Sequence, residues 1–180
     1  MQHASRHMLA VAALLAGLAA SSTARAASCA DTLLSNKELA RFAALVQAAG
    51  LSPQLATGAV TVFAPTNAAL GRISGLTQML APQSSNGQAD YPKLQTLVRA
   101  HLVAGLHSEN SMHGKVALTT LAGTGLAIDG TGQRSIALST SSANNVNLSG
   151  MKITSDVHVA GPALECDNGL IYPVDAALVQ

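Results

Sequence analysis

The side chains best suited to chemistry in this chain are its later histidines and its cysteines. They are His101, His107, His113, His158, Cys29 and Cys166. The first three histidines lie six residues apart, a spacing that does not return to one face of a helix, and no cluster of cysteines or carboxylates accompanies them. This pattern favours scattered surface histidines over a shared metal site, and we expect no metal and no cofactor.

The motifs of the common hydrolases and nucleotide-binding proteins are missing from the sequence. A serine hydrolase often places its nucleophile on a strained Gly-x-Ser-x-Gly turn, and no such motif occurs. Asp156, Asp167 and Asp175 could each orient a histidine, but isolated acids in loops are common. Phosphate, dinucleotide and calcium loops are absent as well. We expect a protein that is not an enzyme, and an enzyme of unassigned type is the weakest alternative.

His101 differs from the other histidines because it lies on the apolar stripe of an expected helix that runs from Leu94 and ends at Gly105. A histidine in such a place is most simply a buried, neutral imidazole that hydrogen-bonds a backbone group. Its pKa should then lie below the ordinary value, because burial disfavours the charged form. The alternative is a small-molecule or metal site in a cleft beside His101.

The cysteine count favours one disulfide. Cys29 and Cys166 are the only cysteines, and in a protein that leaves the reducing cytosol they are expected to pair. The bond would pin the start of the mature chain to a loop before the last strand. The alternatives are two free thiols or a lipoprotein anchored through Cys29, although the preceding residues lack the leucine usual at a lipidation site.

Residues 1–26 have the pattern of a secretory signal peptide. Arg6 makes the start positive, residues 8–20 form an apolar run, and residues 24–26 fit a small-x-small cleavage site. The run is too short to span a membrane, and no later stretch could cross one. We expect residues 27–180 to form one domain that is secreted or periplasmic.

Charge and aromatic content argue against several kinds of partner. The chain carries a net charge of +1, and loss of Arg6 and Arg25 would bring it to −1. Such a chain has no basic footprint for nucleic acid or an anionic membrane. The aromatic residues are too few for a base-stacking or sugar-binding platform: Phe42, Phe63, Tyr91 and Tyr172.

A buried strand that leads into a helix is the clearest element of the chain. Residues 60–63 are apolar or weakly polar on both sides of the expected strand, which places it inside a sheet. Pro65 ends the ladder because it has no N–H group. Thr66 and Asn67 can each cap the helix that follows, since their side chains accept hydrogen bonds from its first N–H groups.

Two helices are expected before this strand. Ser35 and Glu38 have the spacing of a capping box, with Leu34 packed on Leu39 as its hydrophobic staple. A short second helix should have Ser52 as its cap, followed by a proline.

The second half of the chain is rich in short runs of apolar and β-branched residues separated by glycines, which predicts strands linked by hairpins. These runs are residues 116–121, 126–129, 135–140, 146–149 and 151–154. Residues 81–90 read as an exposed loop. Helices first and strands afterwards favour an α+β domain.

Four segments of the chain resemble one known family. Thr61-Val-Phe-Ala-Pro-Thr-Asn67 resembles the first signature of the fasciclin (FAS1) domain. Residues 100–101 stand where the family has a Tyr-His pair, residues 119–123 are similar to its Leu-Ala-Gly strand end, and residues 168–175 to its closing signature. The resemblance marks the following as residues of the structural motif: Thr61, Val62, Phe63, Pro65, Thr66, Asn67, His101, Asn168, Gly169 and Asp175.

The resemblance covers about residues 33–179 and implies a FAS1-like fold. In this fold N-terminal helices pack on a wedge-shaped β-sandwich of short, mostly antiparallel strands. Two departures occur in the closing signature, where Tyr172 replaces the usual histidine and Pro173 an apolar residue. Pro173 predicts a bulge, or an edge position on its N–H side.

The resemblance implies a non-catalytic module for cell adhesion or protein–protein interaction, whose partner is a protein or a component of the extracellular matrix or the envelope. Residues 156–157 occupy the place of an Asp-Ile pair that is associated with receptor binding in animal members. We expect the loop over residues 157–167 and its base to carry the contacts: Asp156, Val157, His158, Pro162 and Glu165. In the alternative, Asp156 only caps nearby N–H groups.

Overall fold

Short helices occupy the first part of the described chain and one later segment. The structure, a computed structural model, describes residues 27–73, 91–132, 135–141 and 157–178. Its α-helices are α1 (Cys29–Ser35), α2 (Ala40–Ala48), α3 (Ser52–Thr57), α4 (Asn67–Leu70) and α6 (Tyr91–Arg99), and its 3₁₀ helices are η1 (Lys37–Leu39) and η2 (Glu109–Met112).

The strands form two sheets of four. They are β1 (Val60–Pro65), β2 (Leu102–Ala104), β3 (Lys115–Thr119), β4 (Gly125–Gly132), β5 (Ser135–Ser141), β6 (Val157–His158), β7 (Leu164–Cys166) and β8 (Gly169–Val174). The first sheet has the order β2-β1-β8-β7 and the second β3-β4-β5-β6. Of the pairs within these sheets, β1 and β8 run parallel and the others antiparallel.

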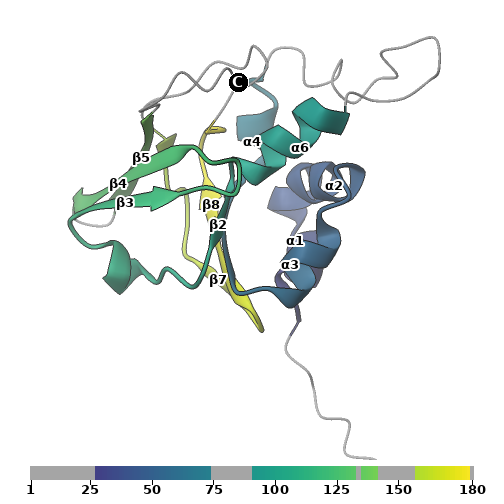
Figure 1. Cartoon of the computed structure of the whole chain (residues 1–180), viewed down its shortest axis with the longest axis horizontal. Helices are drawn as coiled ribbons and strands as arrows, with labels where there is room; N and C mark the ends of the chain where they lie inside the picture. Colours follow the sequence, from purple (N-terminus) through teal and green to yellow (C-terminus); the bar gives the residue numbers. More distant parts are fainter. Residues whose placement is uncertain (1–26, 74–90, 133–134, 142–156, 179–180) are drawn as a thin grey trace, which may run out of the picture.

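The two sheets and the helices form three layers. In Figure 1 α1, α2 and α3 lie on the right, with α6 above them, the sheet with β2 and β8 lies in the middle, and β3, β4 and β5 lie on the left. Isolated bridges between Val103 and Thr120, and between Val159 and Val174, join the two sheets. The chain therefore has the α+β fold that the sequence predicts, and its sheets are one mixed and one antiparallel.

The β1 strand separates two apolar cores. Val60 and Val62 belong to the core beneath the helices, whereas Phe63 belongs to the core between the sheets, and Thr61 shares its side of the strand. All six residues of β1 are buried, and β2 and β8 flank it. The predicted alternation and interior position of β1 are confirmed, and the strand ends at Pro65 as expected.

The first helix of the described chain, α1, was not expected from the sequence. Ser28 caps it, because the Ser28 hydroxyl oxygen accepts a hydrogen bond from the Asp31 N–H at 3.3 Å. The helix is only seven residues long, and its burial rests on contacts with α2, α3, β7 and β8. The later helix α3 lies where predicted, but Leu51 rather than Ser52 occupies its cap position.

The predicted capping box at Ser35 is wrong. Ser35 ends α1, and Asn36 caps the next turn instead, since its Oδ1 accepts from the Glu38 N–H at 2.9 Å. Leu34 is 50% exposed, so it forms no hydrophobic staple with the fully buried Leu39. Asn36 can take this role because asparagine favours the cap position as strongly as serine does.

The turn after β1 is capped by one of its two expected residues. Thr66 Oγ1 accepts from the Ala69 N–H at 3.2 Å, as predicted. Asn67 instead bonds another part of the chain: its Oδ1 accepts from the Arg41 N–H at 2.9 Å, and its Nδ2 donates to the Lys37 carbonyl at 2.7 Å. Asn67 therefore fastens the start of α4 to η1 and α2.

The expected helix from Leu94 to Gly105 is too long. It ends at Arg99, and residues 102–104 form β2, which pairs with β1. Backbone pairing with a buried strand outweighs the helical pattern here. Gly105 turns the chain after β2, with a φ of 90° that suits glycine.

Pro173 lies in β8, an interior strand of the first sheet, and forms no bulge within the register of β8 with β1. The Thr66 N–H donates to the Val174 carbonyl, so the neighbouring Pro173 nitrogen faces away from β1. On that far side β7 pairs with β8 only as far as Ile171. The Pro173 carbonyl there accepts from the Ala160 N–H at 2.7 Å. Neither expected alternative holds in full: there is no bulge, and the proline is accommodated because its nitrogen faces away from β1, beyond the last residue of β8 that pairs with β7.

The predicted disulfide between Cys29 and Cys166 is confirmed, and no described cysteine is free. It joins α1 to β7 across 137 residues of sequence. The expected strands in residues 116–121, 126–129 and 135–140 are present as β3, β4 and β5. The signal peptide, the loop over 81–90, the runs over 146–149 and 151–154, and Asp156 all lie outside the described residues.

Candidate interaction site

The expected interaction segment, residues 157–167, contains two short strands rather than one loop. It begins with β6 and ends with β7. His158, Pro162 and Glu165 are exposed, and Glu165 lies in the middle of β7. Val157 is fully buried in the core between the sheets, so its side chain cannot reach a partner in this structure. The exposed contact residues that remain are the other three.

His158 and Asp175 fix the position of β6 against the end of β8. The His158 N–H donates to Asp175 Oδ1 at 2.8 Å, and the Asp175 N–H donates to the His158 carbonyl at 3.0 Å. The imidazole Nδ1 is 3.6 Å from Asp175 Oδ2, too long for a hydrogen bond, and both side chains are 47% exposed. The pair therefore orders backbone, and it lacks the close contact by which an aspartate orients a catalytic histidine.

Asn168 links three elements near the disulfide. Its Oδ1 accepts from the Cys29 N–H at 3.0 Å, which connects it to α1. Its Nδ2 donates to the carbonyls of Leu55 and Gly58 at 2.9 and 2.7 Å, which connects it to α3. The amide has both its donors and its acceptor engaged, so Asn168 serves the structure and offers little to a ligand.

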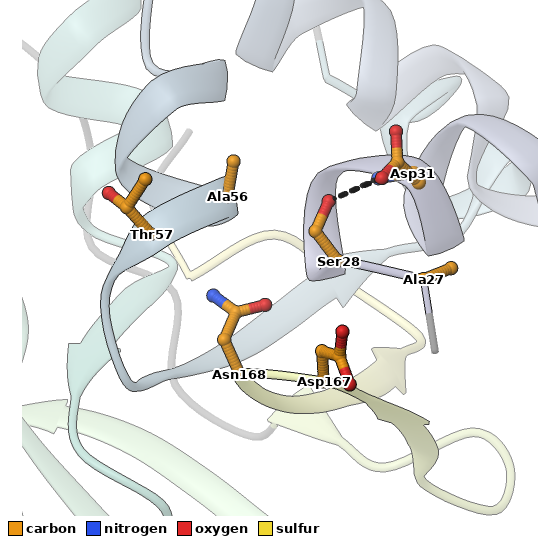
Figure 2. Close-up of a pocket in the computed structure, with 7 residues that line it drawn as sticks. All are labelled: Ala27, Ser28, Asp31, Ala56, Thr57, Asp167 and Asn168. Atoms are coloured by element: carbon orange, nitrogen blue, oxygen red, sulfur yellow. Dashed lines mark hydrogen bonds between the residues drawn. The ribbon is translucent and has the colours of Figure 1, made fainter. Parts of the chain in front are cut away.

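An open hollow of about 900 Å³ lies beside Asn168. Figure 2 shows Asp31 and Ser28 at the start of α1 on one side, Thr57 at the end of α3 on another, and Asp167 below. The Ser28 hydroxyl donates to Asp31 Oδ2 at 2.7 Å. In the described part of the chain no three His, Cys, Asp or Glu side chains gather to hold a metal ion. Two carboxylates across an open hollow do not make a metal site.

His101 is the buried imidazole that the sequence predicts. The ring is fully buried, its Nδ1 is 2.7 Å from the Leu97 carbonyl, and the Leu178 N–H donates to its Nε2 at 3.0 Å. Since Nε2 accepts, the proton of the neutral ring lies on Nδ1. Burial lowers the pKa of His101 from 6.5 to about 4, although the bond to Leu97 acts to raise it. With both nitrogens engaged, His101 has no lone pair left for a metal or a substrate.

A clamped loop after β2 was not found from the sequence. The Thr61 hydroxyl donates to the Gly105 carbonyl at 2.8 Å and accepts from the His107 N–H at 2.9 Å. The Tyr172 hydroxyl donates to the His107 carbonyl at 2.9 Å. Burial and, to a smaller extent, the Glu109 charge raise the pKa of Tyr172 to about 12. The tyrosine at the family's histidine position therefore holds this loop.

A smaller, apolar hollow of about 250 Å³ lies beside the same loop. Its walls come from α3, from the start of β1, from β2 and from Leu121, and they carry no charged side chain. Leu55 and Leu102 in these walls are fully buried, whereas Leu121 is 40% exposed. Periodicity could not reveal this hollow because its residues come from three separate segments, 54–60, 102–104 and Leu121.

The fold and the arrangement of the site residues together define the class of the domain. Helices pack on a mixed sheet whose parallel pair joins an early strand to the last one, and a second sheet closes the other side. Both ring nitrogens of His101 form hydrogen bonds with the backbone. This is the arrangement of an α+β domain with one mixed and one antiparallel sheet.

The family profile described as "Fasciclin domain" matches residues 37–180, and the chain belongs to the fasciclin family. Fasciclin domains are associated with adhesion and interaction and are generally non-catalytic. One similar solved structure is that of a FAS1 domain pair from the insect cell adhesion molecule Fasciclin I. It is 16% identical with a TM-score of 0.63, over 87% of this chain and 52% of that one, so this chain spans about half its length. No curated protein matches the chain.

The disulfide indicates an extracytoplasmic location, because cytosolic thiols are normally kept reduced. Within the described ranges, none of the helices has the length and apolar character needed to cross a membrane.

Proposed function

We propose that this chain is an exported, non-catalytic fasciclin module that binds a protein, or a component of the matrix or envelope, at the cell envelope or outside the cell. Its contact surface is formed by the exposed residues His158, Pro162 and Glu165, and Asp156, which lies outside the described residues, is a further candidate. The observation that carries the proposal is the Cys29–Cys166 bond, which ties the end of this segment to α1.

Rigid anchoring suits a binding segment because it lowers the entropy lost when a partner binds. The disulfide holds one end of the segment, and the Asp175 bonds to His158 hold the other. Between these anchors Pro162 and Glu165 are exposed, so their side chains can meet a partner without unfolding either strand. Short exposed segments on a rigid scaffold commonly carry binding function.

Export of the chain is supported by the signal peptide pattern of residues 1–26 together with the disulfide. Lipidation of Cys29 does not fit this arrangement, because the sulfur is bonded to Cys166 and the residue is fully buried. We therefore place the mature chain free in the periplasm or outside the cell. A ligand site beside His101 gains no support, since the ring is fully buried and both nitrogens are bonded.

The test is capture of partners from the envelope and culture fluid of the native host by the immobilised mature chain. Deleting residues 157–167 would be uninformative because it removes buried Val157 and two strands. The variant is instead the triple substitution His158→Ala, Pro162→Ala and Glu165→Lys, all at exposed positions. The matched control is Lys115→Glu, an exposed charge reversal on β3 in the other sheet.

We expect the triple variant to lose its captured partners while its circular dichroism spectrum and unfolding midpoint stay unchanged. The control should capture as much as the unmodified chain. If the folded triple variant captured the same partners with unchanged affinity, the assignment of this surface would be wrong.

A further inference from the structure

The most exposed large apolar side chain of the described residues is Leu106, which is 62% exposed. It lies in the loop directly after β2. Burying a leucine side chain lowers the free energy, and an exposed leucine has not yet gained this stabilisation. A leucine that is both fixed and exposed is therefore suited to insertion into a partner.

The loop holds Leu106 in a fixed place. Its neighbours on both sides are hydrogen-bonded to Thr61 of the first sheet. The Gly105 carbonyl accepts from Thr61 Oγ1 at 2.8 Å, and the His107 N–H donates to Thr61 Oγ1 at 2.9 Å. Tyr172 adds a hydrogen bond to the His107 carbonyl. Leu106 is therefore presented on a short, anchored turn, and little entropy remains to be lost when it is buried.

The apolar hollow of about 250 Å³ lies directly beside this turn. Ala104, which lines the hollow, is two residues before Leu106, a separation of at most about 7 Å along the chain. The Gly105 N–H donates to the carbonyl of Ala59, which also lines it. A protruding leucine and an apolar hollow thus lie next to each other on the same molecule.

We propose that two copies of this chain pair about a two-fold axis, with Leu106 of each copy inserted into the apolar hollow of the other. A two-fold interface brings the same surface patch of two copies together. The protruding Leu106 and the apolar hollow must therefore both lie within that patch. The hollow is large enough for a leucine side chain, and its walls are uncharged. The mature chain carries a net charge of only −1, so repulsion between copies is weak.

The inference goes beyond the proposed function, which uses residues 156–165 and a different partner. Leu121 belongs to the patch as well, because it lines the hollow and is 40% exposed. Its exposed part would be covered together with Leu106. Both surfaces can then be tested separately on the same folded chain.

The experiment is analytical ultracentrifugation of the mature, disulfide-bonded chain over a wide range of concentrations. We expect a monomer–dimer equilibrium whose dissociation constant rises at least about 100-fold in Leu106→Asp, because two buried leucines are lost per dimer. Leu34→Asp is the matched control: Leu34 is 50% exposed, lies on α1 and does not line the hollow, so its substitution should leave the equilibrium unchanged.

A complementation test separates insertion from a general loss of apolar surface. Ala104→Phe should fill the hollow while keeping the Leu106 knob, so it should be monomeric alone. Mixed with Leu106→Asp, which keeps the hollow, it should recover a weaker dimer with one of the two contacts. Circular dichroism confirms that each variant is folded.

Two results would overturn the proposal. One is an unmodified chain that stays monomeric at millimolar concentration, even if it binds another protein. The other is a rise in the dimer dissociation constant in Leu34→Asp that is as large as the rise in Leu106→Asp. Neither result bears on capture through His158, Pro162 and Glu165.

Discussion

At the scale of single residues, hydrogen bonding decides what His101 can do. The Leu178 N–H points at Nε2, so the ring must present a lone pair there and a proton at Nδ1. A second proton on Nε2 would face the N–H donor and would be buried without a counter-ion. Both effects oppose the charged ring, and His101 therefore contributes pH-dependent stability rather than chemistry.

Acid should destabilise the protein through His101. Its pKa is about 4 in the folded chain and 6.5 in the unfolded chain, so its contribution is complete above pH 6.5 and is lost as the pH falls towards 4. This loss amounts to about 3 kcal/mol of unfolding free energy. His101→Leu should remove it from urea unfolding curves measured between pH 7 and 4. His113→Gln, at an exposed histidine, should retain it; equal slopes in His101→Leu and the unmodified chain would contradict the assignment.

Gly169 is required because another chain segment occupies the space of a side chain. A Cβ atom there would collide with the Val60 carbonyl oxygen and lie 2.7 Å from Cys29 Sγ. We expect Gly169→Ala to lower the unfolding free energy by about 1–3 kcal/mol in urea. Gly161→Ala is the control, since nothing lies within 4 Å of its Cβ position, and it should stay within about 0.5 kcal/mol. Equal effects of the two substitutions would refute the steric explanation.

At the scale of elements, two asparagines join segments that are far apart in sequence. Asn67 connects the turn after β1 to η1 and α2, and Asn168 connects the turn before β8 to α1 and α3. The helices near these turns are short, with six to nine residues each in α1, α2 and α3, and isolated helices of that length are marginal in water. Their positions depend on such cross-links and on burial.

The Asn168 amide should be sensitive to loss of its donor. Asn168→Asp keeps the shape but places a carboxylate oxygen against the carbonyls of Leu55 and Gly58. We expect a loss of at least about 2 kcal/mol in unfolding free energy, with faster hydrogen exchange in α3. In Asn36→Asp the new side chain still accepts from the Glu38 N–H, so stability should hardly change. Similar losses in both variants would show that Nδ2 of Asn168 is unimportant.

At the scale of the whole molecule, the parallel pair of β1 and β8 closes the fold. It brings residues 60–65 against residues 169–174 and forms the middle of the first sheet. Ile171 faces the core under the helices, and Tyr172 faces the core between the sheets. Neither core can be complete until the end of the chain has been added.

Truncation tests this dependence and the expected domain boundaries. We expect residues 27–180 to fold without the leader, and residues 27–167 to remain unfolded because they lack β8. Amide dispersion in NMR spectra distinguishes the two states. A dispersed spectrum from residues 27–167 would mean that β8 is dispensable and that the first sheet forms without its parallel pair.

The sequence by itself determined several of the local elements and their buried faces. The alternation in β1, the glycine-separated runs of β3 to β5 and the apolar stripe of α6 can all be read from the local pattern of apolar residues. This pattern repeats every two residues in a strand and every three or four in a helix. The Cys29–Cys166 pair followed from counting, since there were only two cysteines to pair. Each of these inferences uses information that is local or has a single solution.

The tertiary structure decided what depends on distant neighbours. It placed β2 where a helix was expected, buried Val157, fixed the tautomer of His101 and assembled the apolar hollow from three segments. None of these has a period in the sequence, because each arises when segments distant in sequence meet, as His101 and Leu178 do across 77 residues. The sequence sets which face of an element is apolar, whereas packing sets which partner covers it.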